Sequence, residues 1–295
     1  MRLAVISDVH GNYKALEAFL EALEKEAIKK GPIDGIIGLG DYVTDAPYPE
    51  KIFAVFQAMA EKYPCYVVRG NREEYLLENE QKDQGWHPSS ASGSLYYTAK
   101  HISREQMQCL KKLSGERILS FPGLPSLTLC HGVPGRSRGN VALEEKLLER
   151  ALNEAGTDWL LGGHTHKQQM ERIGGKTYMN PGSLGLCIDH EGCHAQYAVL
   201  CGEQGEWRAE FHTIPYDVQG YLRDFRESGL EEYGKILTKA IEKTLLTGRN
   251  YFYDCVALAA QLYGGPLFEI TEEIWEEAAC RLAIDPFFNE KLSAE

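Results

Sequence analysis

The sequence predicts an α/β fold, because three short apolar runs alternate with amphipathic stretches in its first quarter. Residues 3–6, 35–39 and 65–68 are continuous apolar runs, which are typical of strands covered on both faces. Residues 16–27 and 49–63 have apolar side chains at helical spacing and follow the first two runs. Strand, polar turn and helix in succession indicate βαβ units, whose strands lie parallel in one sheet.

The rest of the chain divides into an interruption, further strands and a helical end. Residues 73–115 lack the alternation of strand and helix patterns seen before them. Their pattern predicts helices at 95–101 and 103–113, with Ser103 as an N-cap. Strands are expected at 117–121, 126–130, 159–161, 176–179, 195–200 and 207–214, with a helix at 140–155. We therefore predict a main domain at 1–216, with a helical insertion at about 73–115 over the mouth of the site. A C-terminal helical extension at 217–295, whose last helix ends near Pro286, is expected to pack on it.

Composition narrows the class of protein. A formal net charge of -12 disfavours broad binding to nucleic acid or to an anionic membrane, although bound divalent cations would reverse that sign locally. The eight cysteines contain no Cys-x-x-Cys pair and predict reduced thiols in a cytoplasmic protein. No signal-peptide pattern and no apolar run of about 18 residues is present. Aromatic residues after 217 predict core packing, and those left exposed favour a homodimer.

Metal-capable side chains follow the ends of the apolar runs. Carboxyl ends of parallel strands share one edge of a sheet, where ligands bind in open α/β folds. Asp41 is alone on its strand and is the natural bridge between two ions. Mixed oxygen and nitrogen donors suit Mn, Fe or Zn, and two such ions activate water against a phosphoryl centre. The residues concerned are Asp8, His10, Asp41, Asn71, His131, His164 and His166.

Each of these residues also has an ordinary structural explanation. Asp8 could be a helix N-cap, Asp41 a turn residue, Asn71 a left-handed residue and His131 a solitary loop histidine. Their joint occurrence, each after an apolar run, favours a shared site.

Taken as an ordered set, the motifs resemble those of the calcineurin-like metallophosphoesterases, over roughly residues 2–215. The resemblance is closest to the compact prokaryotic branch of phosphodiesterases and dinucleoside polyphosphate hydrolases. The motifs are Asp8-Val9-His10-Gly11-Asn12, Gly40-Asp41-Tyr42-Val43, Gly70-Asn71-Arg72-Glu73, His131-Gly132, Gly163-His164-Thr165-His166 and Asn180-Pro181-Gly182-Ser183.

The resemblance implies a four-layer α/β/β/α sandwich and a dinuclear centre of Mn, Fe, Zn or Ni. A hydroxide bridging the two ions would be the nucleophile that hydrolyses phosphodiesters or pyrophosphates of small nucleotide-like substrates. One ion would be held by Asp8, His10, Asp41 and His166, and the other by Asp41, Asn71, His131 and His164.

One position departs from the family pattern. A histidine commonly follows the Gly-Asn pair and helps to protonate the leaving group, whereas this chain has Arg72. Arginine cannot be a general acid near neutral pH, but it can hold phosphoryl oxygens. We therefore assign catalytic roles to Arg72 and Asp41, and expect weak action on alkyl monoesters. His87 or His101 could supply a substitute acid, with His87 as a substrate contact, although both also read as surface histidines.

Other activities stay open at this point. A phosphomonoesterase or a serine/threonine protein phosphatase would use the same ligands. A nuclease is disfavoured by the net charge. A non-catalytic metal-binding scaffold is expected to have lost ligands, and none is missing here.

Overall fold

The computed structural model describes residues 1–82, 85–138, 145–190 and 194–284. Its first five-stranded sheet has the order β10-β9-β1-β2-β3. The strands β1, β2 and β3 are parallel, as the βαβ pattern predicts, while β9 and β10 add antiparallel. The bounds are β1 (Arg2–Ile6), β2 (Gly35–Gly38), β3 (Cys65–Val67), β9 (His194–Glu203) and β10 (Glu206–Pro215).

The second five-stranded sheet has the order β4-β5-β6-β8-β7. Sequence analysis identified every strand of it except β7, an edge strand of sequence QQMERI. Only Met170 and Ile173 of its six residues are apolar, and they are three positions apart, so β7 has neither the apolar run nor the alternation that predicts a strand. The bounds are β4 (Glu116–Leu119), β5 (Leu127–Cys130), β6 (Trp159–Leu161), β7 (Gln168–Ile173) and β8 (Lys176–Pro181).

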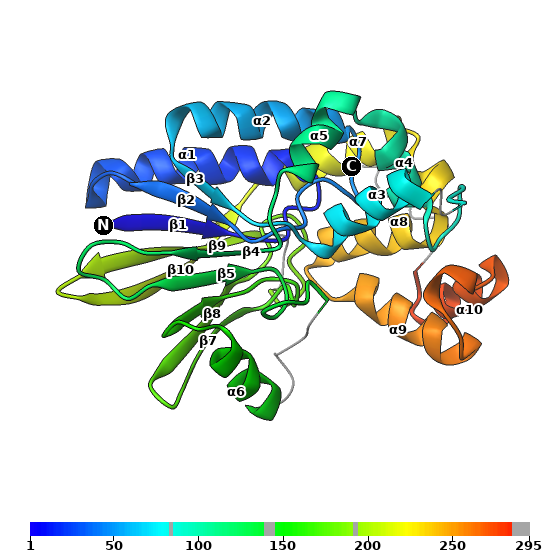
Figure 1. The fold of residues 1–295 in the computed structure, drawn as a ribbon. Coiled ribbons are helices and arrows are strands. Elements are labelled where there is room, and N and C mark those ends of the chain that lie inside the picture. Colours follow the sequence, from blue (N-terminus) through cyan, green and yellow to red (C-terminus); the bar gives the residue numbers. More distant parts are fainter. Residues whose placement is uncertain (83–84, 139–144, 191–193, 285–295) are drawn as a thin grey trace.

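Helices cover the outer faces of the two sheets, which confirms the four-layer α/β/β/α sandwich (Figure 1). The first sheet carries α1 (Tyr13–Lys30) and α2 (Pro49–Lys62), and the second carries α6 (Glu145–Glu154). Alternation along β1 explains the layering, because Leu3 and Val5 belong to the core between the sheets while Ala4 and Ile6 belong to the core beneath the helices.

The interruption between β3 and β4 is helical. It contains α3 (Asn71–Lys82), α4 (Gly93–His101) and α5 (Arg104–Lys111). Ser103 is the N-cap of α5, as predicted, and its side chain accepts a hydrogen bond from the amide of Gln106. The predicted helix at 140–155 is observed as α6, and residues 140–144 lie outside the described residues.

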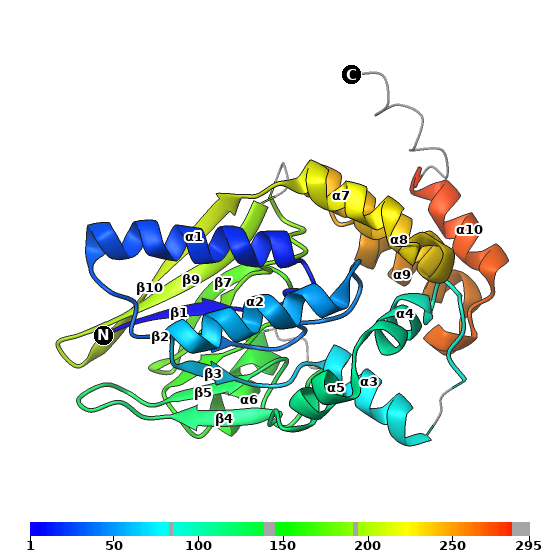
Figure 2. The same cartoon turned by 90° about the horizontal axis from the view of Figure 1, so that it is seen from above.

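The C-terminal helices gather at the end of the molecule where β1 and β2 finish (Figures 1 and 2). Four of their aromatic side chains, Tyr221, Phe225, Phe252 and Trp275, are buried, whereas Tyr263 and Phe268 are exposed. The homodimer expected from exposed aromatics and the domain division at residue 217 stay predictions. Pro286 lies outside the described residues. The elements are α7 (Val218–Glu227), α8 (Leu230–Thr247), α9 (Tyr251–Tyr263), η1 (Leu267–Glu269) and α10 (Glu272–Arg281).

Two further observations concern the helices and the thiols. No helix among the described residues is long and apolar enough to cross a bilayer. Among the described cysteines, Cys130 and Cys255 are buried.

A buried acid in α8 predicts a pH-dependent stability. Burial and the neighbouring Glu231 raise the pKa of Glu242 from 4.5 to about 8. Between these values the unfolded chain loses a proton that the folded chain keeps, so stability falls as the pH rises. Glu242→Gln is therefore expected to be more stable than wild type at pH 8, by on the order of 2 kcal/mol, and close to it at pH 5. Urea unfolding at both pH values measures the difference, with the exposed Glu232→Gln as control. An equal difference at both pH values would contradict the prediction.

Candidate metal centre

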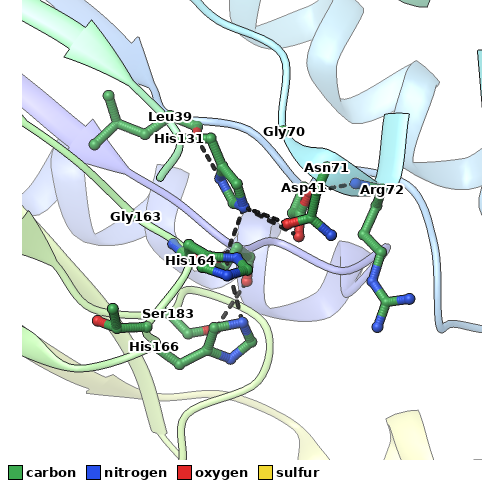
Figure 3. Close-up of polar contacts among 12 residues, drawn as sticks. Leu39, Asp41, Gly70, Asn71, Arg72, His131, Gly163, His164, His166 and Ser183 are labelled. Atoms are coloured by element: carbon green, nitrogen blue, oxygen red, sulfur yellow. Dashed lines mark hydrogen bonds and ion pairs between the residues drawn. The ribbon is translucent and has the colours of Figure 1, made fainter. Parts of the chain in front are cut away.

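The polar side chains that follow β1, β2, β3, β5 and β6 converge on one buried volume, since these strands end at the same edge of the sandwich (Figure 3). All the ligands expected from the sequence lie there, in two groups whose donor atoms are within 4.8 Å of one another, with Asn71 beside the second.

The first group consists of Asp8, His10 and His166. The Nε2 atoms of His10 and His166 are 3.1 Å apart. Asp8 Oδ1 lies 3.3 Å from His166 Nε2 and 4.0 Å from His10 Nε2. Three donors therefore face a single point.

The second group consists of Asp41, His131 and His164. His131 Nε2 lies 3.3 Å from Asp41 Oδ2 and 3.1 Å from Asn71 Oδ1. The rings of His131 and His164 meet edge to face with their centroids 5.2 Å apart.

Asp41 lies between the two groups. Its Oδ2 atom is 3.9 Å from His10 Nε2 and 3.3 Å from His131 Nε2, so one oxygen faces both sets of donors. Its other oxygen, Oδ1, accepts a hydrogen bond of 2.8 Å from the backbone amide of Arg72. The carboxylate is therefore held in an orientation that suits a bridge between two ions.

Outer hydrogen bonds turn the imidazoles toward this volume. His131 Nδ1 donates to the Leu39 carbonyl at 2.7 Å, and His166 Nδ1 donates to the Leu186 carbonyl at 2.8 Å. His10 Nδ1 lies 3.1 Å from the Asp45 carboxylate. Each ring thus presents Nε2 to the site, as metal-binding histidines do when their other nitrogen is engaged.

The backbone is unusual at the same residues. Asp8, His10, Asp41, His164 and His166 all have positive φ angles, between 43° and 67°. Such conformations cost about 1–3 kcal/mol each and tend to cluster at functional sites.

Gly163, directly before His164, is required by the close approach of two backbone segments. A Cβ atom on Gly163 would lie 1.9 Å from Ser7 Oγ and 3.0 Å from Asp8 Oδ2. Only glycine therefore allows the segment after β6 to lie against the segment after β1.

The electrostatics suit bound cations. Burial opposes ionisation of both aspartates, yet the neighbouring histidines lower the pKa of Asp41 to about 2 and that of Asp8 well below its usual range. Burial disfavours protonated His131, but the Asp41 carboxylate raises the His131 pKa to about 10. Burial and the charge of His131 lower the pKa of His164 to about 4.

The surroundings of one carboxylate oxygen, Asp8 Oδ1, indicate that a cation fits this volume. Asp8 Oδ1 is buried and has no hydrogen-bond partner among the described residues. A buried carboxylate oxygen without a donor is costly unless a cation meets it. The donor set and this oxygen therefore fit divalent ions, which Asp8, His10, His166 and Asp41 would hold on one side and Asp41, Asn71, His131 and His164 on the other.

The family model described as the calcineurin-like phosphoesterase superfamily domain matches residues 1–204. The chain belongs to this superfamily. It is a phosphoesterase, and the family depends on metal ions, which agrees with the donor clusters. The helices α7 to α10 lie beyond the matched residues.

Solved structures show the same fold. A metallophosphoesterase from Sphaerobacter thermophilus has 23% identity and a TM-score of 0.61, covering 78% of this chain and 95% of its own. A hypothetical protein from Pyrococcus horikoshii OT3 has 20% identity and a TM-score of 0.71, covering 84% of this chain and 98% of its own. None of the curated protein sequences is a significant match.

Asp45 is a residue of this phosphoesterase that sequence analysis did not single out. Besides its contact with His10, its carboxylate accepts a hydrogen bond of 2.6 Å from Ser94 Oγ and lies 3.2 Å from Arg72 Nε. It thus connects a proposed ligand to the arginine that replaces the family histidine. Burial opposes the charged form of Arg72, but the Asp45 carboxylate raises its pKa overall, so the guanidinium stays protonated.

Glu73 holds two strand-end loops of the phosphoesterase together. Its buried carboxylate accepts hydrogen bonds from the backbone amides of Asp41 at 2.9 Å, Tyr42 at 2.7 Å and Gly70 at 2.9 Å. Burial and the Asp41 carboxylate raise its pKa to about 7. Its place in the Gly-Asn-Arg-Glu motif was the only sequence signal for this role.

The histidines of the interruption lie apart from the clustered ligands of the phosphoesterase. His87 is exposed, and its ring contacts the Gly85 carbonyl at 3.1 Å. His101 is exposed, stacks on Tyr97 and contacts the Tyr97 carbonyl at 2.8 Å. Among the described residues, neither has a contact with a proposed ligand, so a substrate role for His87 stays a prediction.

Proposed function

We propose that this phosphoesterase is a dinuclear enzyme that hydrolyses phosphodiester or pyrophosphate bonds of small nucleotide-like substrates. The observation that best supports this proposal is the position of Asp41 Oδ2 between two compact sets of metal-donor atoms. Imidazole nitrogens combined with carboxylate and amide oxygens favour Mn, Fe or Zn, with Ni as a further candidate. When bound, two such ions lower the pKa of water and neutralise charge on a phosphoryl group.

Arg72 supports the preference for diesters and anhydrides. Its side chain is 17% exposed, and its guanidinium pairs with Asp45 at the edge of the donor cluster, where it can hold phosphoryl oxygens. A permanently protonated group cannot give its proton to a leaving alkoxide. Substrates whose leaving group is already stable, such as nucleotides or aryl alcohols, should therefore react best.

A cavity lined by residues that closely follow two proposed ligands in sequence supports a nucleotide-like substrate. It has a volume of about 600 Å³, within the range of small-molecule sites. Its lining includes Val133, two residues beyond His131, and Glu74, three residues beyond Asn71. Arg136, Arg138 and Arg150 line it together with Glu74, Glu78 and Glu154, so its charges are mixed. Arg138 pairs with Glu78 and Arg150 with Glu154, and Arg136 would offer a cationic contact to a phosphate.

A substrate panel with Mn²⁺ tests the proposal. The panel compares an alkyl monoester, β-glycerol phosphate, with bis-p-nitrophenyl phosphate and diadenosine tetraphosphate by kcat/KM. We expect the diester or the dinucleotide to exceed the monoester by about tenfold or more, since each tenfold step corresponds to about 1.4 kcal/mol of barrier. A more than tenfold preference for the monoester would refute the argument from Arg72.

Arg72→His provides a matched comparison within the same panel. It places a titratable group where the family has its histidine, so the ratio of monoester to diester hydrolysis should rise by about tenfold or more. An unchanged ratio would mean that this position does not determine substrate preference. Wild-type protein that binds Mn²⁺ but hydrolyses none of the three compounds would favour a non-catalytic scaffold.

A further inference from the structure

The C-terminal helix α9 places a tyrosine against the candidate centre. Tyr253 Oη lies 2.9 Å from His166 Nε2, and the two rings meet edge to face at 5.1 Å and 89°. Tyr253 is 87 residues from His166 in sequence and lies outside the residues matched by the family model. The contact is therefore a property of this chain's own extension.

The start of α9 fixes the position of this tyrosine. Asn250 caps the helix and accepts a hydrogen bond from the Tyr253 amide at 3.2 Å. Thr244 Oγ1, in α8, accepts from the amides of Tyr251 and Phe252 at 3.2 and 3.0 Å. Phe252 is buried and lies 5.9 Å from the Arg72 guanidinium. The helix start is thus anchored on α8 and also adjoins the arginine of the proposed site.

The direction of the Tyr253 hydrogen bond indicates what the hydroxyl would contact once a metal ion is bound. His166 Nδ1 donates to the Leu186 carbonyl, so Nε2 of the neutral ring accepts the hydrogen bond of Tyr253. The same Nε2 atom faces Asp8 and His10 and would bind an ion there. A metal bound to Nε2 would occupy this acceptor, so the hydroxyl would be available to donate to another group.

We propose that the Tyr253 hydroxyl is a substrate contact that donates a hydrogen bond to a phosphoryl oxygen on the His166 side of the centre. Arg72, which lies 5.9 Å from the Phe252 ring, would hold the same phosphoryl group, so the C-terminal extension completes the substrate site. This inference rests on the proposed function, since it requires a phosphoryl group at the centre.

The test measures binding of inorganic phosphate to Mn²⁺-loaded full-length protein by calorimetry. Tyr253→Phe keeps the ring and removes only the hydroxyl, and its phosphate Kd should rise about tenfold, as expected for one hydrogen bond to a charged group. Tyr251→Phe removes a hydroxyl from the same helix and should stay within twofold of wild type. Mn²⁺ content, measured by mass spectrometry of the purified proteins, should be equal in all three.

Four results would decide against part or all of this account. A phosphate Kd of Tyr253→Phe within twofold of wild type would overturn the inference. Loss of Mn²⁺ from that variant would also overturn it, because the hydroxyl would then act on the metal. Wild-type protein that binds phosphate but hydrolyses no ester would overturn the proposed function and leave the Tyr253 comparison valid. Wild-type protein that does not bind phosphate would overturn both.

Discussion

Asp41→Asn should lower kcat/KM for bis-p-nitrophenyl phosphate by roughly a thousandfold, or about 4 kcal/mol of barrier. The Asp41 Oδ2 atom faces His10 and His131 together, so its negative charge would serve both ions at once. Asparagine keeps the shape but removes the charge, and an amide cannot replace a bridging carboxylate between two cations. The bound metal should fall as well, and elemental analysis of the purified variant measures it.

The matched control for this substitution is Asp34→Asn, at an exposed aspartate near the start of β2. It removes the same charge from the chain, so a change in overall net charge cannot explain a difference between the two variants. Asp41→Asn protein with wild-type metal content and wild-type activity would remove the basis of the dinuclear proposal.

Asp45→Asn should weaken Mn²⁺ binding by about 10- to 100-fold, the range typical of residues that orient metal ligands. Asp45 engages His10 Nδ1 and pairs with Arg72 Nε, so its charge positions a proposed ligand and a proposed phosphate contact. Without it, Arg72 would keep its charge in a largely buried position and lose its counter-ion, which is costly. Activity should fall with metal affinity, and titration with a fluorescent chelator measures the Mn²⁺ Kd.

Ser94→Ala is the comparison for Asp45. It removes one hydrogen bond to the Asp45 carboxylate and leaves the charge and the contact with His10 in place. We expect the Mn²⁺ Kd to change by less than about fivefold, because Asp45 keeps the charge and the contacts with His10 and Arg72 that orient the ligand. Equal losses in both variants would mean that the network stabilises the loop without orienting the ligand.

Much of the architecture was accessible from residue patterns. The runs before Ser7, Gly40 and Arg69 are apolar and short, and parallel strands must end at a common edge, so the polar residues after them were expected to meet. The strand β7 escaped detection because its exposed edge position permits a polar sequence. The secondary structure of a buried segment can be predicted from its apolar periodicity. An exposed edge strand is instead formed by its hydrogen bonds to the neighbouring strand.

The sequence by itself determined the positions of most strands along the chain, the edge at which their ends meet and the metal-capable groups placed there. Only the tertiary structure decided that Asp45 bridges His10 and Arg72, that Glu73 joins two loops, and that Tyr253 reaches His166. The period and spacing of apolar residues report only the secondary structure and the buried face of one segment. A contact such as Tyr253 with His166 depends on how separate layers pack, which no local pattern encodes.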